Sequence, residues 1–287
     1  MKFFVKAALV TALFTAGHVV ASDLNITQYN PGSNGIFPTT SVLISGEKEA
    51  ILFDAQFSTV DGKALVEKIK ATGKTLNMIY VSSGDPDYYF GLEPLVNAFP
   101  EAKVVASQSI VDHITKTKEG KLAYWGPILK DGAPNSIVVP QVFNDTELYL
   151  EGKKIEVKEI NSHQAYLWLP SQKTVFGGVS VTSGMHVWTA DSQTKQARSE
   201  WVQSLERMKA LEPQTVIPGH YLGEVPSGAE AVQFTIDYLT NFETALKSSK
   251  NVTSGDVIKA MKQRYPKLEG VSDLELSAKV NTGEMEW

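Results

Sequence analysis

The stretch from residue 41 to residue 106 alternates short apolar runs with helical patterns, and this alternation limits the folds open to the chain. The first two runs flank a turn and predict a hairpin that ends at Asp54. Apolar residues at helical spacing then predict a helix from about residue 59 to residue 72, which Gly73 ends. The later runs have the composition of buried strands, so the segment predicts a β-α-β unit. The four runs are 41–44, 50–53, 78–81 and 103–106.

The second half of the chain also alternates strand and helix signals. A helix is predicted from about residue 199 to 211, before an apolar strand at 215–218, and further helices are predicted near 230–250 and 256–264. The middle, 113–143, has poor periodicity and is interpreted as a helix followed by a covering loop. Two strand-rich halves with helices outside predict one α/β domain over residues 22–287, a four-layer αββα sandwich. The strand-like runs of this half are 147–150, 154–160, 165–169 and 174–176.

Composition narrows the chemistry and the partners. The 287 residues are 43% hydrophobic and 21% charged, which is enough for a full core. Cysteine is absent from the sequence, so neither disulfides nor thiolate ligands are available. The net charge of −5 comes without a basic stripe, which argues against nucleic acid or an anionic membrane as the main partner.

The first 21 residues have the pattern of a secretory signal peptide. Lys2 and Lys6 precede or border an apolar run over residues 7–16, and small residues surround a cleavage point after Ala21. The apolar run is short for a transmembrane anchor, the rival interpretation, and Gly17 follows it directly. We therefore expect a periplasmic or secreted protein with no membrane attachment after cleavage.

The loop at residues 81–91 reads Val-Ser-Ser-Gly-Asp-Pro-Asp-Tyr-Tyr-Phe-Gly and resembles the metal-binding loop of metallo-beta-lactamase-fold hydrolases. The family pattern His-x-His-x-Asp-His falls on Ser83, Asp85, Asp87 and Tyr88, so only Asp87 keeps the family residue. The resemblance implies the αββα sandwich of the metallo-beta-lactamase type. Further segments follow in the family's order: Asp54, 168–170, 175–178, 186–188, 217–220 and 283–287.

The resemblance also implies a metal site, and the sequence departs from it. Working members hold two cations about 3.5–4 Å apart, which activate a water molecule. The first metal would take Ser83, Asp85 and a residue between Ile160 and His163. The second would take Asp87, Tyr88 and His220, and Val179 stands where a bridging Asp normally follows the Gly-Gly pair. Zinc held by His and carboxylate normally has three protein ligands, so we do not expect the two-zinc site.

Three roles remain open for the surviving polar residues. Asp85, Asp87 and His220 could hold a single divalent cation. Asp87 and His220 could instead form a metal-free catalytic acid–base pair. In the third interpretation, Asp87 only caps the following helix, while Asp85 is solvated before Pro86.

Several residues near these positions are candidates for a ligand pocket. Aromatic side chains at the mouth of a cleft suit flat or apolar ligands. His186 is also consistent with a structural role in the core. The expected pocket residues are Ser83, Asp85, Tyr88, His163, His186 and Trp188.

The leading hypothesis is an exported protein of this fold that has lost its dinuclear site. It would be an inactive or non-canonical hydrolase homologue that binds a small molecule. The alternative is an active hydrolase that uses a single metal or the Asp87–His220 pair on an ester, lactone or amide.

Overall fold

Two β-sheets pack face to face in the computed structural model, which describes residues 23–162 and 165–287. Apolar side chains of both sheets form a shared core, which includes Phe53, Tyr80 and Leu167. Burial of such side chains contributes about 1.5–3 kcal/mol each, so this interface is a main source of stability. The first sheet runs in the order β1 (Asn25–Tyr29), β2 (Ser41–Ser45), β3 (Glu49–Phe53), β4 (Thr75–Tyr80), β5 (Lys103–Ala106) and β6 (Gln141–Val142).

The second sheet is mostly antiparallel. Its hairpin β7–β8 pairs Leu148 with Ile155, and both side chains are buried against the first sheet. This sheet runs in the order β12 (Thr215–Val216), β10 (Thr174–Phe176), β9 (Tyr166–Leu169), β8 (Lys153–Lys158) and β7 (Glu147–Leu150). A separate parallel pair joins β11 (Thr182–Ser183) to β13 (His220–Tyr221).

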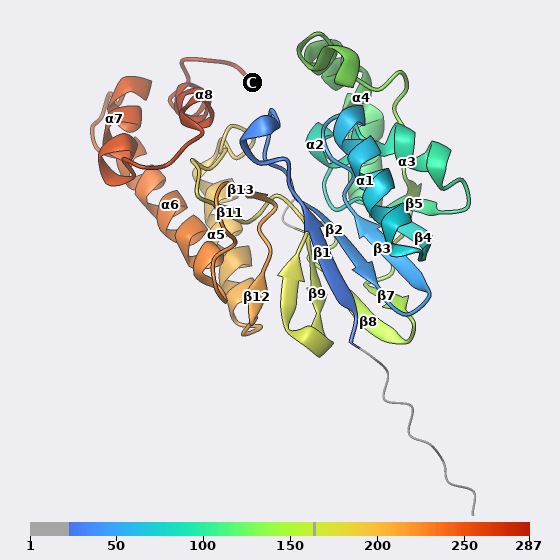
Figure 1. Cartoon of the computed structure of the whole chain (residues 1–287). Coiled ribbons are helices and arrows are strands. Elements are labelled where there is room, and N and C mark those ends of the chain that lie inside the picture. The colour runs from blue at the N-terminus through green and yellow to red at the C-terminus, as the bar shows by residue number, and fades with distance from the viewer. Residues whose placement is uncertain (1–22, 163–164) are drawn as a thin grey trace, which may run out of the picture.

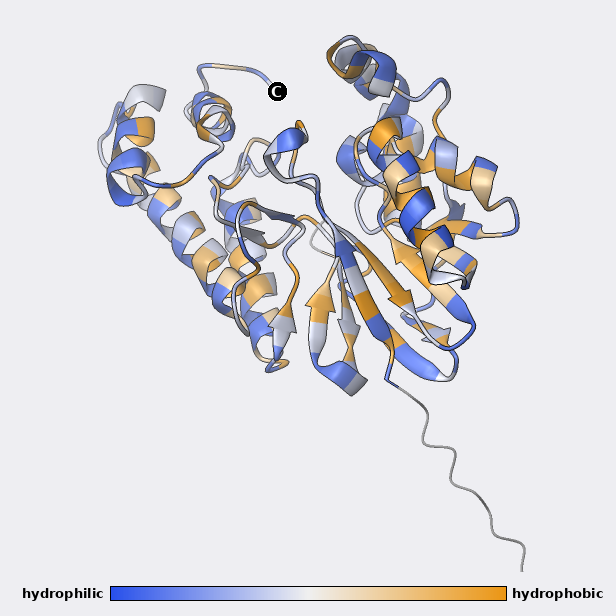
Figure 2. Ribbon diagram, viewed as in Figure 1, coloured by the Kyte–Doolittle hydropathy of each residue, from blue (hydrophilic) through white to orange (hydrophobic). Residues whose placement is uncertain are grey.

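Helices cover the outer face of each sheet, which confirms the predicted four-layer αββα arrangement (Figure 1). The helices of the first half are α1 (Thr59–Thr72), α2 (Pro86–Tyr89), α3 (Leu92–Ala98) and α4 (Gln108–Leu129). Those of the second half are α5 (Lys195–Lys209), α6 (Glu230–Leu246), α7 (Ser254–Arg264) and α8 (Val271–Asn281). Hydrophobic residues line the strands and one side of the helices, as Figure 2 shows. Short 3₁₀ turns complete the fold at η1 (Gly32–Asn34), η2 (Lys130–Gly132) and η3 (Pro170–Gln172).

The predicted helix at residues 59–72 forms with those bounds because both ends are specified locally. Ser58 caps its N-terminus by accepting a hydrogen bond from the backbone N–H of Asp61. Gly73 ends it in the left-handed conformation, with φ of 66°.

The middle segment folds into α4, which contains Trp125 and is longer than the other helices that the structure describes. Only Ile110 and Ile114 of this helix are buried, which explains the weak apolar periodicity of its sequence. Helix α8 was not predicted, and it supplies one residue of the site described below.

None of the helices in the described part of the chain is long and apolar enough to cross a membrane. The predicted signal peptide and His163 lie outside the described residues.

Candidate functional site

Asp87 and His220, two residues at which the sequence resemblance implies metal ligands, lie in direct contact. Asp87 is in α2, just after β4, and His220 begins β13, 133 residues away in sequence. The His220 Nε2 atom lies 2.7 Å from Asp87 Oδ2, and their side chains are 18% and 9% exposed. Thr39 completes this side of the pair, because its hydroxyl donates to Asp87 Oδ2 at 2.8 Å. The structure thus brings together the two predicted catalytic candidates, shielded from solvent.

Tyr88 occupies the other side of the His220 ring. Its hydroxyl lies 3.3 Å from His220 Nδ1 and donates to the carbonyl of Gly178 at 3.2 Å. Burial, followed by the charges of nearby carboxylates such as Asp87, raises the pKa of Tyr88 well above its ordinary value, so the phenol is neutral. Both ring nitrogens of His220 therefore have protein partners.

The electrostatics of the pair favour an imidazolium beside a carboxylate. Burial opposes the charge on His220, but the hydrogen bond and negative charge of Asp87 outweigh it and raise the pKa of His220. Asp273 of α8 adds to this effect, and burial raises the pKa of Asp273 itself to about 6. Sequence reasoning missed Asp273 because it did not predict α8.

A second buried carboxylate, Asp54, holds the loop after β4 through hydrogen bonds to Ser82. It accepts the backbone N–H and the hydroxyl of Ser82 at 2.7 and 2.6 Å. The Ser82 hydroxyl in turn accepts the N–H of Gly178 at 2.7 Å. Burial raises the pKa of Asp54 to about 7, although the Ser82 hydrogen bonds act against this. Ser82 and Tyr88 therefore anchor the same glycine, which holds the loop after β4 against the turn after β10 (Thr174–Phe176).

Asp85 contacts Lys121 of α4 and Ser83 of its own loop. Its Oδ1 atom lies 3.4 Å from Lys121 Nζ, and its Oδ2 accepts from the Ser83 hydroxyl at 3.1 Å. Lys121 also donates to the carbonyl of Gly84 at 2.9 Å and lies 3.1 Å from His113 Nε2. Asp85 stands at the N-cap of α2 without a capping side-chain bond, so Asp87 does not serve as that cap.

The residues at the family's metal positions do not fit a two-zinc centre. Asp87 and His220 are bonded to each other, and Val179 packs against the apolar core of the first half. Over residues 23–162 and 165–287, no three His, Asp or Glu side chains are grouped so that they could hold a metal ion. The predicted set of Asp85, Asp87 and His220 is thus not gathered around one point.

The remaining pocket candidates lie in different surroundings. His186 is buried, and its Nδ1 atom is 2.9 Å from the hydroxyl of Tyr238 on α6, while its Nε2 atom has no hydrogen-bond partner among the described residues. Burial, and then the charge of Lys262, lowers the pKa of His186 to about 4. Trp188 is half-buried, and its indole donates to Asp191 at 2.6 Å. His163 lies outside the described residues.

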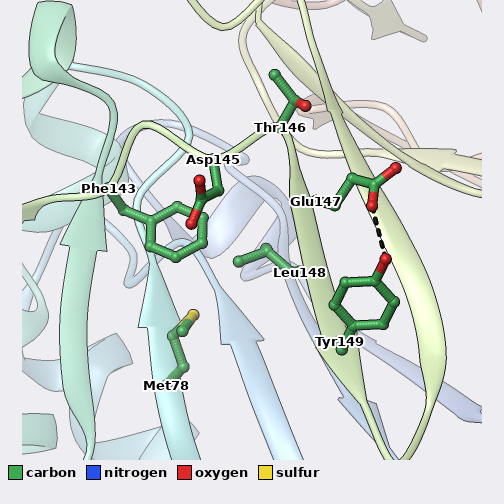
Figure 3. A pocket seen from close by; sticks show the side chains of 7 residues that line it. All are labelled: Met78, Phe143, Asp145, Thr146, Glu147, Leu148 and Tyr149. Atoms are coloured by element: carbon green, nitrogen blue, oxygen red, sulfur yellow. Dashed lines mark hydrogen bonds between the residues drawn. The ribbon is translucent and has the colours of Figure 1, made fainter.

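Two surface hollows open at the edges of the sandwich, away from the Asp87–His220 pair. The one in Figure 3 has a volume of about 500 Å³ and lies beside β7, between Met78, Phe143 and Tyr149. Two carboxylates line it: Glu147 is already bonded to Tyr149 and Lys154, and Asp145 lies before β7. The other lies between β1 and β12, lined by residues such as Gln28 and Thr215. Neither hollow gathers convergent polar groups, so neither replaces the pair as the candidate site.

Comparison with known proteins agrees with this architecture. A sequence model of the metallo-beta-lactamase superfamily matches residues 34–220. A metallo-beta-lactamase from Pontibacter korlensis is 20% identical, with a TM-score of 0.56, over 76% of this chain and 100% of that one. The DIM-1 metallo-beta-lactamase is 20% identical, with a TM-score of 0.53, over 77% of this chain and 98% of that one.

VMB-1 is 21% identical, with a TM-score of 0.54, over 76% of this chain and 96% of that one. At these identities the solved structures establish the fold alone. No curated protein matches the sequence significantly. The family match ends at His220, so α6, α7 and α8 lie beyond it. Because the matched region spans more than half of the sequence, the chain belongs to the metallo-beta-lactamase superfamily.

Proposed function

We propose that this protein binds a small ligand without a resident metal and does not carry out the metal-assisted hydrolysis of its family. The direct bond between Asp87 and His220, at 2.7 Å, carries the metal-free part of this proposal. In a metal centre these atoms would point their lone pairs at a cation. Here they satisfy each other, and Thr39 and Tyr88 take up the neighbouring positions.

The single-metal alternative would require a large rearrangement. Asp87 and His220 would have to separate, and Asp85 would have to leave Lys121 and Ser83. Breaking a shielded ion pair leaves each charge uncompensated and is strongly unfavourable. The free energy of cation binding would first have to offset that cost, and only the remainder would appear as affinity.

The metal-free acid–base alternative lacks a free proton-transfer atom. A catalytic base must reach the substrate proton directly or through one water molecule. One ring nitrogen of His220 is bonded to Asp87, and the other faces the hydroxyl of Tyr88, which is fully buried and donates to the Gly178 carbonyl, so neither nitrogen is open to a substrate. We therefore favour a structural role for the pair, as a latch that joins the two halves of the domain.

The proposal places the protein in the periplasm or outside the cell. Its support is the composition of residues 1–21, with basic residues, an apolar run and small residues around Ala21. N-terminal sequencing of the protein from a cell envelope fraction tests this, because export with cleavage predicts a start at Ser22.

Elemental mass spectrometry on protein purified without chelator or affinity-tag metal tests the metal-free proposal. We expect well below about 0.1 ion per chain, and the same urea midpoint with and without EDTA, because no metal contributes to folding. Asp145→Asn is the matched control, because Asp145 is an exposed carboxylate between β6 and β7, outside every candidate metal set. About one ion per chain, lost in Asp87→Ala and in His220→Ala but kept in the control, would overturn the proposal.

A further inference from the structure

Five aromatic side chains contact one another in a closed circuit beside the degenerate loop. Starting at Phe37, each ring meets the next, and the last returns to the first. The ring centroids lie 5.4 Å apart for Phe37–Trp125, 4.9 Å for Trp125–Tyr124, 6.3 Å for Tyr124–Trp287, 5.3 Å for Trp287–Trp188 and 6.1 Å for Trp188–Phe37. We call these residues the aromatic circuit.

Neighbouring rings of the aromatic circuit are steeply inclined to one another. All five neighbouring pairs meet edge to face, with interplanar angles from 68° to 87°. A flat circuit with these spacings has its centre about 5 Å from each ring centroid, within the distance at which aromatic faces attract a cation. Successive perpendicular rings are also the arrangement that aromatic cages for alkylated ammonium groups use.

The aromatic circuit lies at the surface. None of its rings is buried, and Tyr124 and Trp287 are 54% and 44% exposed. The apolar side chains of Ile36, Ile128 and Met285 are exposed as well. Exposed aromatic rings that contact one another are the kind of apolar surface that marks interaction sites on soluble proteins.

Distant parts of the chain build the aromatic circuit. Tyr124 and Trp125 come from α4, Phe37 follows η1, and Trp188 belongs to the second half. Trp287 comes from the segment after α8, which approaches α4 in Figure 1 and lies beyond the family match. Four of the five residues lie within the matched family region, and Trp287, from beyond it, closes the circuit.

A carboxylate is fixed at the aromatic circuit. Asp191 accepts the indole N–H of Trp188 at 2.6 Å and that of Trp287 at 2.9 Å. Burial, and then the negative charge of Asp85, raises the pKa of Asp191, while Lys121 acts in the opposite direction. Lys121 is itself engaged by Gly84 and Asp85. A bound cation would stabilise the ionised form of Asp191, which complements the ring faces in charge.

We infer that the aromatic circuit, with Asp191, binds an organic cation through an alkylated ammonium group. This inference rests on the proposed ligand-binding function and names its ligand class. The ring faces enclose the alkyl groups, and the carboxylate balances the charge. A neutral molecule of the same shape gains only the apolar contact, so it binds more weakly.

Calorimetric titration of the purified protein with choline, tetramethylammonium and 3,3-dimethylbutan-1-ol tests this inference. The alcohol is the neutral isostere of choline, so it separates charge from shape. We expect saturable binding of both cations and about tenfold weaker binding of the alcohol. Equal binding of choline and the alcohol would overturn the inference, and so would no saturable cation binding up to about 10 mM.

Variants at the aromatic circuit and at Asp191 test where choline binds. Asp191→Asn and Tyr124→Leu should each weaken choline binding about fivefold. Tyr149→Leu is the matched control, because Tyr149 is 60% exposed on β7, outside the aromatic circuit. Choline binding that is equally strong in Tyr124→Leu and in the control, with Asp191→Asn also unchanged, would place the ligand elsewhere and contradict the inference.

The two proposals fail separately. Stoichiometric metal that is lost in His220→Ala would overturn the metal-free function, whatever choline does. Metal-free protein that binds neither cation would overturn the assigned ligand class alone.

Discussion

The Asp87–His220 latch predicts a measurable coupling energy between two residues that are 133 positions apart. Removing one partner of a fully buried ion pair costs about 3–5 kcal/mol, because the other charge is left uncompensated. The side chains here are 18% and 9% exposed, so we expect about 3 kcal/mol for Asp87→Ala and for His220→Ala.

The double variant leaves no charge stranded and should cost clearly less than the sum of the two single variants. We expect a coupling energy of about 2 kcal/mol. Urea unfolding of the four proteins at pH 6, followed by circular dichroism and tryptophan fluorescence, measures it. EDTA is present throughout, so any metal contribution is removed.

The coupling energy between Asp87 and His220 should decrease as the pH rises. The pKa of His220 in the folded protein is raised above its ordinary value of 6.5, so the folded state binds the proton more tightly than the unfolded state. The stabilisation is therefore complete below about pH 6.5 and is lost as the pH rises through the folded-state pKa. A coupling energy below about 0.5 kcal/mol at pH 6, or one that grows between pH 6 and pH 9, would refute the latch.

Three further predictions concern Tyr88, Gly178 and His186. Tyr88→Phe removes the hydroxyl between His220 and Gly178, and should lower the free energy of unfolding by about 1–2 kcal/mol in urea titrations while the ring remains packed. Gly178→Ala should cost about 3 kcal/mol or more and reduce soluble yield, because the glycine has φ of 73° and an added Cβ would lie 2.0 Å from the Ala165 carbonyl oxygen. The pKa of His186 is lowered to about 4, so its contribution to stability is present above pH 6.5 and is lost as the pH falls from 6.5 toward 4. Melting temperatures between pH 7 and pH 4.5 should therefore fall more steeply for the natural protein than for His186→Gln, and parallel curves would contradict this assignment.

Much of the fold could be predicted from local patterns. The hairpin before Asp54, the bounds of α1 and the buried strand β4 follow from apolar periodicity and from the end signal at Gly73. The replacement of family ligands by Ser83, Tyr88 and Val179 is also visible in the sequence. These features depend on neighbours within a few residues, so the sequence alone carries them.

Helices α2, α4 and α8 are exceptions, and α2 falls within the stretch that the sequence analysis treats as a loop. Only two residues of α4 are buried, so its apolar pattern was too weak to define its bounds. Helix α8 went unrecognised, and with it Asp273, whose charge acts on His220.

The roles of the site residues were decided by the tertiary structure. Asp87 could have capped a helix, held a cation or paired with His220, and each role is compatible with the same sequence. Pairing of Thr39 with His220 in a β-bridge and packing of Tyr88 against Gly178 select the latch. Asp85 faces Lys121 because α4 lies against its loop.

The sequence by itself determined the αββα layers and the loss of the family's metal ligands, since both follow from residue type and spacing along the chain. Only the tertiary structure decided that Asp87 bonds to His220 and that five aromatic rings close into a circuit. Asp87 and His220 are 133 residues apart, and the circuit contact Tyr124–Trp287 joins residues 163 apart. Their geometry depends on how the two sheets and their covering helices pack, and no local pattern contains that information.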